Sequence, residues 1–148
     1  LLVDGKRYKD KQKRGLMISA ARSYLFNQVL ASRVVAGNWQ ELMPDDPLPE
    51  PSGPLWGRGR SLAKGELLFW EQSALADWQP WCDGLEHAGL SQERRALRLL
   101  PANTGWRWID TDLEVSFSLA AGEFATAILR EIARLDNPPS HHAYGELE

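Results

Sequence analysis

Apolar residues recur at steps of three and four over residues 16–34, which predicts an amphipathic helix. Gly37 follows the last apolar position and is placed to end that helix. The polar residues 5–14 before it show neither helical nor strand periodicity, which predicts an exposed arm. Arg22 falls off the apolar stripe and Asn27 lies at its margin.

Two shorter helices are predicted after a proline-rich stretch. Five prolines between residues 41 and 54 predict an irregular surface loop, because proline lacks an amide donor and restricts the residue before it. Residues 66–78 then predict a second helix, and Pro80 is expected to break the pattern before a third helix at residues 81–88. The expected buried side of the second helix consists of Leu67, Leu68, Phe69, Leu75 and Trp78.

The last third of the chain changes to strand patterns. Short strands are predicted at residues 95–100 and 106–109, around a turn at PANTG (101–105). Residues 113–119 alternate apolar and polar side chains, which is typical of a half-buried strand. A final helix follows, so the fold class is α+β. Its expected core stripe consists of Phe124, Ile128, Ile132 and Leu135.

Composition is that of one globular domain: 148 residues, 43% of them hydrophobic, with a net charge of −3. The charge is segregated, because residues 1–40 carry eight Lys/Arg and two Asp, whereas residues 41–148 carry nine Lys/Arg and eighteen acids. Such asymmetry suits a protein that meets phosphates with one region, and a solvated basic linker is the alternative. No apolar run approaches the ~20 residues of a membrane span, so we expect a cytoplasmic protein.

Searches for catalytic motifs find little. The single cysteine, Cys82, excludes an internal disulfide framework and is expected to be a small, half-buried hydrophobic residue. The three histidines, two of them the tail residues His141 and His142, lack the spacing of metal ligands. No phosphate loop, nucleophile elbow or dinucleotide fingerprint occurs. Asp110 and Asp112 are interpreted as turn residues.

Seven tryptophans make the chain rich in aromatic residues. Trp106 and Trp108 point to the same face of their predicted strand and could form a platform for RNA bases. Core packing is the expected role for most of the tryptophans. Trp39 and Trp56, which flank the proline-rich loop, are the exceptions that could be exposed.

The junction from strand to helix at residues 119–124 is the most interesting candidate for a binding site. A helix N-terminus offers free amides and the positive end of the helix dipole to a phosphate or a base carbonyl. Gly122 leaves room for close approach, Phe124 could stack on a base, and Arg130 could meet a phosphate. The alternatives are a packing glycine, a core aromatic residue and a structurally paired arginine.

Several separated segments together resemble the C-terminal half of the tRNA pseudouridine synthase D family. Their order and approximate spacing match that family over nearly the whole chain. The segments are KRGLMISAARSYLFNQVLASRV (13–34), GPLWG (53–57), FWEQ (69–72), RRALRLLP (94–101), WRW (106–108) and LEVSFSLAAGEFATAILREI (113–132).

The resemblance implies cofactor-free isomerisation of uridine 13 in tRNA to pseudouridine by a nucleophilic aspartate. The family carries that aspartate in an N-terminal half that does not occur in this sequence, so the chain alone is expected to be inactive. It further implies a helical RNA-clasping domain at residues 1–92, the end of a mixed-sheet catalytic domain at 93–137, and a tail at 138–148. The expected partners are tRNA and the N-terminal half, in a monomeric full protein.

The residues that the resemblance carries over are supporting ones. Gly122 and Phe124 are expected to wall the uridine pocket and Arg130 to organise its charge, whereas Arg22 and Asn27 belong to the helix motif, with mainly structural roles. The family's longer insertion near residues 38–50 is absent, which we interpret as residues omitted from a larger protein. A non-catalytic RNA-binding module and a plain interaction domain remain alternatives.

Overall fold

The computed structural model describes residues 10–120 and 123–134 and divides the chain into two units, residues 1–98 and 99–148. Helices and small antiparallel sheets together confirm the α+β class. No described helix has a stretch long and apolar enough to cross a membrane. The first unit contains α1 (Lys11–Val35), β1 (Ser52–Leu55), α2 (Gly65–Ala74), the 3-10 helix η1 (Ala76–Trp78), α3 (Gln79–Glu86) and β2 (Glu93–Ala96). The second contains β3 (Ala102–Ile109), β4 (Asp112–Ser118) and α4 (Ala125–Ile132).

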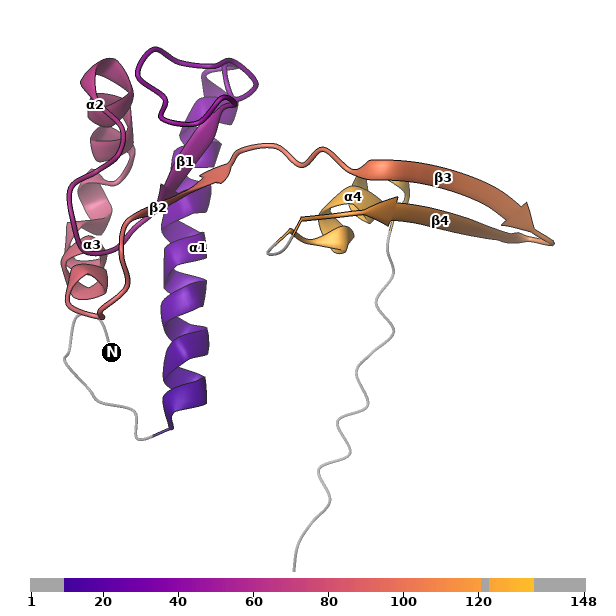
Figure 1. Ribbon diagram of the computed structural model, residues 1–148, viewed down its shortest axis with the longest axis horizontal. Helices are drawn as coiled ribbons and strands as arrows, with labels where there is room; N and C mark the ends of the chain where they lie inside the picture. Colours follow the sequence, from indigo (N-terminus) through magenta and orange to yellow (C-terminus); the bar gives the residue numbers. More distant parts are fainter. Residues whose placement is uncertain (1–9, 121–122, 135–148) are drawn as a thin grey trace, which may run out of the picture. The chain divides into compact units, whose positions relative to one another are not determined.

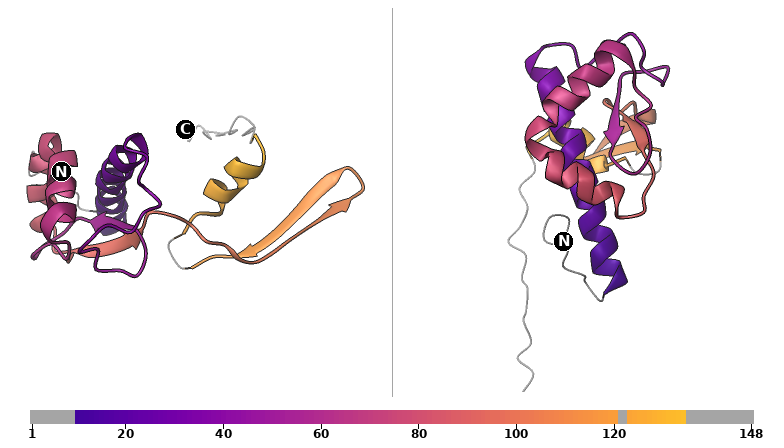
Figure 2. Two further views of the ribbon diagram at one scale, coloured as in Figure 1. Left: turned by 90° about the horizontal axis from the view of Figure 1, so that it is seen from above. Right: turned by 90° about the vertical axis from the view of Figure 1, so that its left-hand side faces the viewer.

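The first unit is built on α1. Strands β1 and β2 pair antiparallel and form a short ribbon across α1, while α2 and α3 lie beside that helix (Figures 1 and 2). β2, which we expected to begin the catalytic portion, thus pairs within the first unit, and the boundary between the units falls after Arg98.

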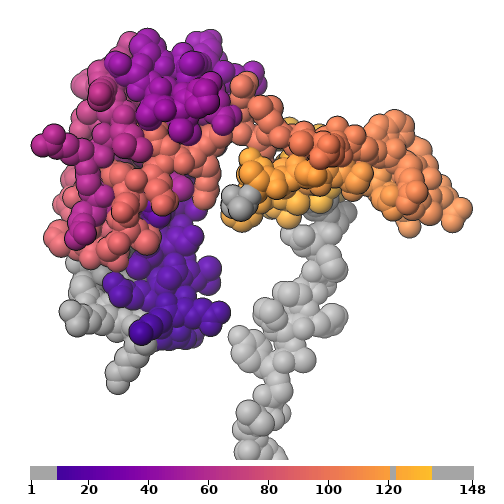
Figure 3. Space-filling model, viewed as in Figure 1, coloured from indigo at the N-terminus to yellow at the C-terminus, as the bar shows by residue number. Residues whose placement is uncertain are grey.

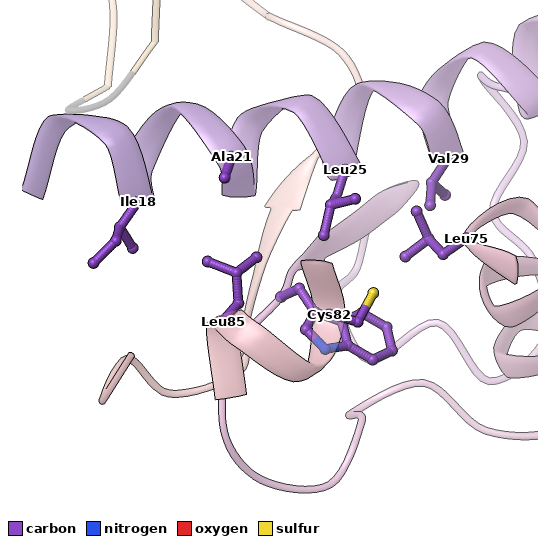
Figure 4. Packing of buried hydrophobic residues seen from close by; sticks show 8 residues of the cluster. Ile18, Ala21, Leu25, Val29, Leu75, Cys82 and Leu85 are labelled. Carbon is purple, nitrogen blue, oxygen red and sulfur yellow. The ribbon is translucent and has the colours of Figure 1, made fainter. Parts of the chain in front are cut away.

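The core of the first unit follows the predicted stripe of α1. Residues spaced by three and four along α1 face α3 and the end of α2 (Figure 4), because this spacing returns to the same side of a helix. The buried cluster consists of Ile18, Ala21, Leu25, Val29, Trp56, Leu75, Cys82 and Leu85. The prediction for the apolar face of the first helix is therefore confirmed for Ile18 to Val29, whereas Leu16 and Val34, at the two ends of the predicted stripe, are exposed.

Cys82 lies in this cluster as a small hydrophobic residue, and it is fully buried where a half-buried position was expected. Burial raises the pKa of its thiol to about 12. Since only the thiolate is nucleophilic, we expect iodoacetamide at pH 8 to leave Cys82 unmodified in the folded chain and to alkylate it in urea. Intact mass measured over time checks this, and alkylation at the same rate with and without urea would contradict the burial.

α1 begins five residues earlier than predicted. Asp10 accepts hydrogen bonds from the amides of Gln12 and Lys13 at 2.9 and 3.1 Å, and this cap starts the helix at Lys11. The prediction of an arm over residues 5–14 is therefore wrong for its last four residues. The predicted stop at Gly37 is confirmed by its φ of 75° and by the amide that it directs to the Val34 carbonyl.

The proline-rich stretch is not irregular to its end, because β1 begins at Ser52 and includes Pro54. The Leu97 amide donates to the Pro51 carbonyl at 2.8 Å, and hydrogen-bonded pairs alternate with non-bonded ones. The pair of Pro54 with Arg94 is thus a non-hydrogen-bonded one. An amide at position 54 would not take part in the hydrogen bonds between β1 and β2. Pro54 therefore fits into the strand although proline has no amide hydrogen.

The second and third helices differ from the prediction in two places. α2 ends at Ala74, and Phe69, expected on its buried side, is 72% exposed. Pro80 does not break the third helix but lies in the first turn of α3, where the missing amide would have had no partner. Gly89, with φ of 90°, follows the end of that helix.

The second unit is a hairpin followed by a helix. β3 pairs with β4 around Asp110 and Thr111, which confirms the turn role of Asp110. The expected turn at PANTG is wrong, because Ala102 to Gly105 belong to β3. A register shift there places Asn103 at φ 51°, a conformation that asparagine tolerates.

One face of the hairpin is apolar. Trp106 opposes Val115 and Trp108 opposes Leu113, so these four side chains share a face, while Arg107 and Glu114 pair at 2.6 Å on the other. The two tryptophans are 71% and 64% exposed in the structure, which contradicts the expectation of core packing.

No described residue of the second unit is fully buried, although apolar side chains line both the hairpin and α4. Phe124 and Ile132, expected in a core stripe, are 61% and 49% exposed. Leu135 lies outside the described residues. Trp56 of the first unit shows the opposite error: it is buried, and its Nε1 donates to Glu86 Oε1 at 3.1 Å.

Candidate nucleic-acid interface

Phe124 and Arg130, the predicted residues of the second unit, belong to one short helix. Phe124 occupies the N-cap position of α4, and Arg130 lies in its last turn. Both side chains are exposed, so each is available to a ligand. Gly122, predicted as a wall of the same pocket, lies outside the described residues.

Glu123 ties the end of β4 to the start of α4. Its Oε2 accepts a hydrogen bond from the Ala120 amide at 2.7 Å, and its own amide donates to the Ala120 carbonyl at 3.2 Å. This pair of bonds holds Glu123, the residue before Phe124, against Ala120. The carboxylate also adds negative charge beside the helix N-terminus. This charge disfavours the binding of a phosphate there and favours an uncharged ligand that stacks on Phe124.

Arg22 acts as a clamp inside the first unit. Its Nη2 donates to the carbonyls of Leu55 and Ser91, both at 2.8 Å, and contacts Glu93 Oε2 at 3.2 Å. The guanidinium thereby joins α1 to the end of β1 and the start of β2. These contacts agree with the mainly structural role expected for Arg22.

Asn27 stands apart from Arg22 on the helix. Five residues separate them, which corresponds to about 140° around the helix axis at 100° per residue. Arg22 faces the strands, whereas the side chain of Asn27 is exposed. The structure therefore does not bring these two predicted residues into one site.

A buried ionic network holds the first unit together where the sequence predicted no site. Arg94 of β2 donates to both carboxylate oxygens of Glu71 in α2, at 2.7 and 3.2 Å. Its Nε also donates to Ser52 Oγ at 2.7 Å, and Ser52 Oγ contacts Asp46 Oδ1 at 2.5 Å. The side chains of Arg94, Glu71 and Asp46 are 3%, 0% and 0% exposed.

Burial governs the titration of this network. Desolvation raises the pKa of Glu71, and the nearby Asp46 carboxylate raises it further, while the bonds from Arg94 lower it. Two carboxylates thus compete for one guanidinium. Arg94 donates two side-chain hydrogen bonds to Glu71, whereas Asp46 also accepts from the Ser52 amide and hydroxyl.

Arg33 is a second buried cation, near the end of α1, and its charge also acts on Glu71 and Asp46. Its fully buried side chain donates from Nη2 to the carbonyls of Asn38 and Glu41 at 2.7 and 2.5 Å. It thereby fixes the chain where it leaves the helix. Sequence analysis missed Arg33 as a core residue because an arginine off the apolar stripe normally indicates a solvated position.

The described residues hold no group of three or more histidine, cysteine or acidic side chains that could bind a metal ion. His87 instead packs on its own helix, with Nδ1 2.7 Å from the Asp83 carbonyl. The exposed aromatic and basic side chains of the two units are therefore the features that need a functional explanation.

Comparison with known proteins gives such an explanation. The chain is 57% identical over 138 residues to tRNA pseudouridine synthase D of Cellvibrio japonicus, a match that covers 93% of this chain and 41% of the relative. It is 40% identical over 158 positions to tRNA pseudouridine synthase D of Nitrosococcus oceani, covering 88% of this chain and 44% of the relative. The protein of that name from Aeromonas hydrophila is also 40% identical, with 89% and 45% covered.

No protein-family profile matches the chain. The chain spans less than half the length of these three curated relatives. The similarity itself extends across both structural units, because each match covers 88% or more of the chain. Both the first unit and the hairpin unit are therefore common to these proteins.

Proposed function

We propose, because this chain belongs to the tRNA pseudouridine synthase D family, that it forms part of an enzyme that isomerises a uridine of tRNA. The observation that carries the proposal is the 57% identity over 93% of the chain. Uridine 13 is the position that the family resemblance implies. The first unit supplies RNA-binding surface, and the second supplies a wall of the nucleoside pocket.

The proposed reaction needs no cofactor. A carboxylate attacks the sugar carbon that carries the base, and the bond from that carbon to the base nitrogen breaks. The base turns, and one of its ring carbons displaces the carboxylate and bonds to the sugar. That ring carbon loses its hydrogen as a proton and the freed base nitrogen gains a proton, so the product is an isomer of uridine. The nucleophilic aspartate belongs to a part of the enzyme beyond these 148 residues, and Phe124 packs against the base while it turns.

The exposed face of the hairpin supports the participation of a further part of the protein. A two-stranded hairpin is marginal by itself, and Trp106, Trp108 and Leu113 leave apolar surface uncovered in the second unit. We propose that the N-terminal half of the enzyme covers this face and extends the β3–β4 ribbon into the catalytic sheet. The full protein is a monomer in this proposal.

The lengths of the aligned regions indicate whether residues are missing from this chain compared with its relatives. In the N. oceani match, 88% of 148 residues is about 130, so about 28 of the 158 aligned positions have no counterpart in this chain. The C. japonicus match runs over 138 positions and uses 93% of the chain, which leaves no such excess. This supports a natural difference in length between members of the family rather than residues omitted from this chain.

The test is tritium release from tRNA labelled at the uridine carbon that becomes bonded to the sugar. We expect turnover by the full-length protein and none by the 148-residue chain, because the chain lacks the nucleophile. Turnover by the isolated chain would contradict the proposal. Tight tRNA binding without turnover by the full-length protein would instead assign it as a non-catalytic RNA-binding module.

A further inference from the structure

An open groove of about 460 Å³ lies in the first unit, between the first turns of α1 and the segment that follows α3. The start of α1 forms the exposed indigo surface in Figure 3. A lysine, two arginines and a serine share this groove with small and apolar residues. The lining consists of Lys11, Arg14, Gly15, Ile18, Ser19, Arg22, Ala88 and Leu90.

The groove exists because the side of α1 that faces the core is apolar from Ile18 onward and basic before it. Steps of three and four carry the stripe from Leu25 back through Ile18 to Arg14 and Lys11, so basic side chains replace apolar ones on the same side of the helix. No atom lies within 4 Å of the position that a Cβ on Gly15 would take. This part of the helix backbone therefore borders open space.

The charge of the groove is positive. α1 carries Lys11, Lys13, Arg14, Arg22 and Arg33 and no acidic residue. Lys11 and Arg14 form no ion pair with any residue that the structure describes.

Asp10, an acid beside the start of α1, and Glu93, an acid beside Arg22, are both engaged. Asp10 caps the helix through the amides of Gln12 and Lys13, and Glu93 pairs with Arg22. Lys11 and Arg14 are thus the cations that remain for a ligand, while Arg22 shapes the wall through its bonds to Leu55 and Ser91.

We infer that this groove binds the sugar-phosphate backbone of RNA, an inference that rests on the proposed function. Side chains three residues apart on a helix stand about 5–6 Å apart at their Cβ atoms, so Lys11 and Arg14 can each meet a phosphate of one strand. The hydroxyl of Ser19 can donate to the backbone, and Ile18 and Leu90 offer apolar surface to the sugars. Contacts of this kind position the RNA without reading its sequence.

The test replaces both cations in the full-length protein, as Lys11→Gln with Arg14→Gln, and measures tRNA affinity between 50 and 200 mM salt. Each phosphate contact contributes about 0.7–0.9 to the slope of log affinity against log salt, so the slope should become shallower by about 1.4–1.8. The matched control, Lys13→Gln with Lys64→Gln, removes two exposed charges outside the groove and should keep the slope of the unaltered protein.

Equal slopes for the groove variant and the control would overturn the inference. It would also be overturned if polyglutamate displaced tRNA from the groove of the unaltered protein as effectively as unlabelled tRNA, since the groove would then be a site for an acidic protein. Activity separates the two proposals. A shallower slope in a protein that forms no pseudouridine supports the groove and contradicts the reaction, whereas pseudouridine formation with equal slopes contradicts the groove alone.

Discussion

Replacing Arg94 with leucine is expected to destabilise the first unit by about 3–5 kcal/mol, because the change leaves two buried carboxylates without their cation. Glu71 and Asp46 are fully buried, and the Arg94 guanidinium lies 2.7 and 3.9 Å from them. Without it, Glu71 loses both hydrogen bonds from its cation, while Asp46 keeps the bonds from the Ser52 amide and hydroxyl. The same change also removes the bonds that Arg94 makes to the hydroxyl and carbonyl of Ser52.

Amide hydrogen exchange gives a local measure of this effect. The Ser52 amide donates to Asp46 Oδ2 at 2.9 Å, and the Leu97 amide donates to the Pro51 carbonyl at 2.8 Å, so both report on the β1–β2 ribbon. Hydrogen exchange gives a free energy of opening at each of these amides. We expect the Arg94 variant to lower this free energy by the same amount as it lowers the free energy of unfolding measured in urea. These measurements apply to the 148-residue chain.

The neighbouring arginine is the matched control. Arg95 is half-buried, and its guanidinium carbon lies 5.4 Å from the centre of the Phe26 ring, a contact worth about 0.5–1 kcal/mol. Arg95→Leu should therefore cost far less than Arg94→Leu. Equal costs would contradict the dependence of the core on the ionic network.

A second pair of variants separates lost charge from lost packing. Arg94→Met alone leaves both carboxylates unpaired, whereas Arg94→Met combined with Glu71→Leu leaves only Asp46. The double variant should be the more stable of the two, because an apolar pair can replace a buried ion pair at little cost. The reverse order would mean that Glu71 stabilises the unit independently of Arg94.

The sequence predicts the helices of the first unit well, since their burial repeats with the helical period. Leu25 and Val29 are buried where the period places them, and Gly37 ends α1. Arg94 and Glu71 escape such analysis, because they are 23 residues apart and no local pattern relates them. Their contact depends on how β2 pairs with β1, which is a property of the folded chain.

Errors in the second unit have a different physical origin. The alternation along β4 correctly predicts a strand, but apolar side chains indicate burial only when something covers them. Trp106 and Trp108 are apolar residues of a face that the described chain leaves uncovered. Their exposure agrees with the proposal that another part of the protein covers this face.

Replacing Phe124 with alanine in the full-length protein is expected to lower kcat/KM for pseudouridine formation by about fivefold to 150-fold. Phe124 is 61% exposed at the N-cap of α4, so its ring contributes little to the second unit itself. In the proposed pocket the ring stacks on the uracil, and loss of such stacking costs about 1–3 kcal/mol per base. Tritium release measures this effect.

Two further measurements distinguish stacking on the base from a purely structural role. Phe124→Tyr keeps the ring and should retain activity close to that of the unaltered protein. Binding of tRNA by Phe124→Ala should change much less than turnover, because phosphate contacts dominate affinity for nucleic acid. Phe69→Ala in α2 serves as the matched control, since that ring is 72% exposed in the first unit. If Phe124→Ala turned over tRNA as fast as Phe69→Ala, the second unit would not wall the nucleoside pocket through this residue.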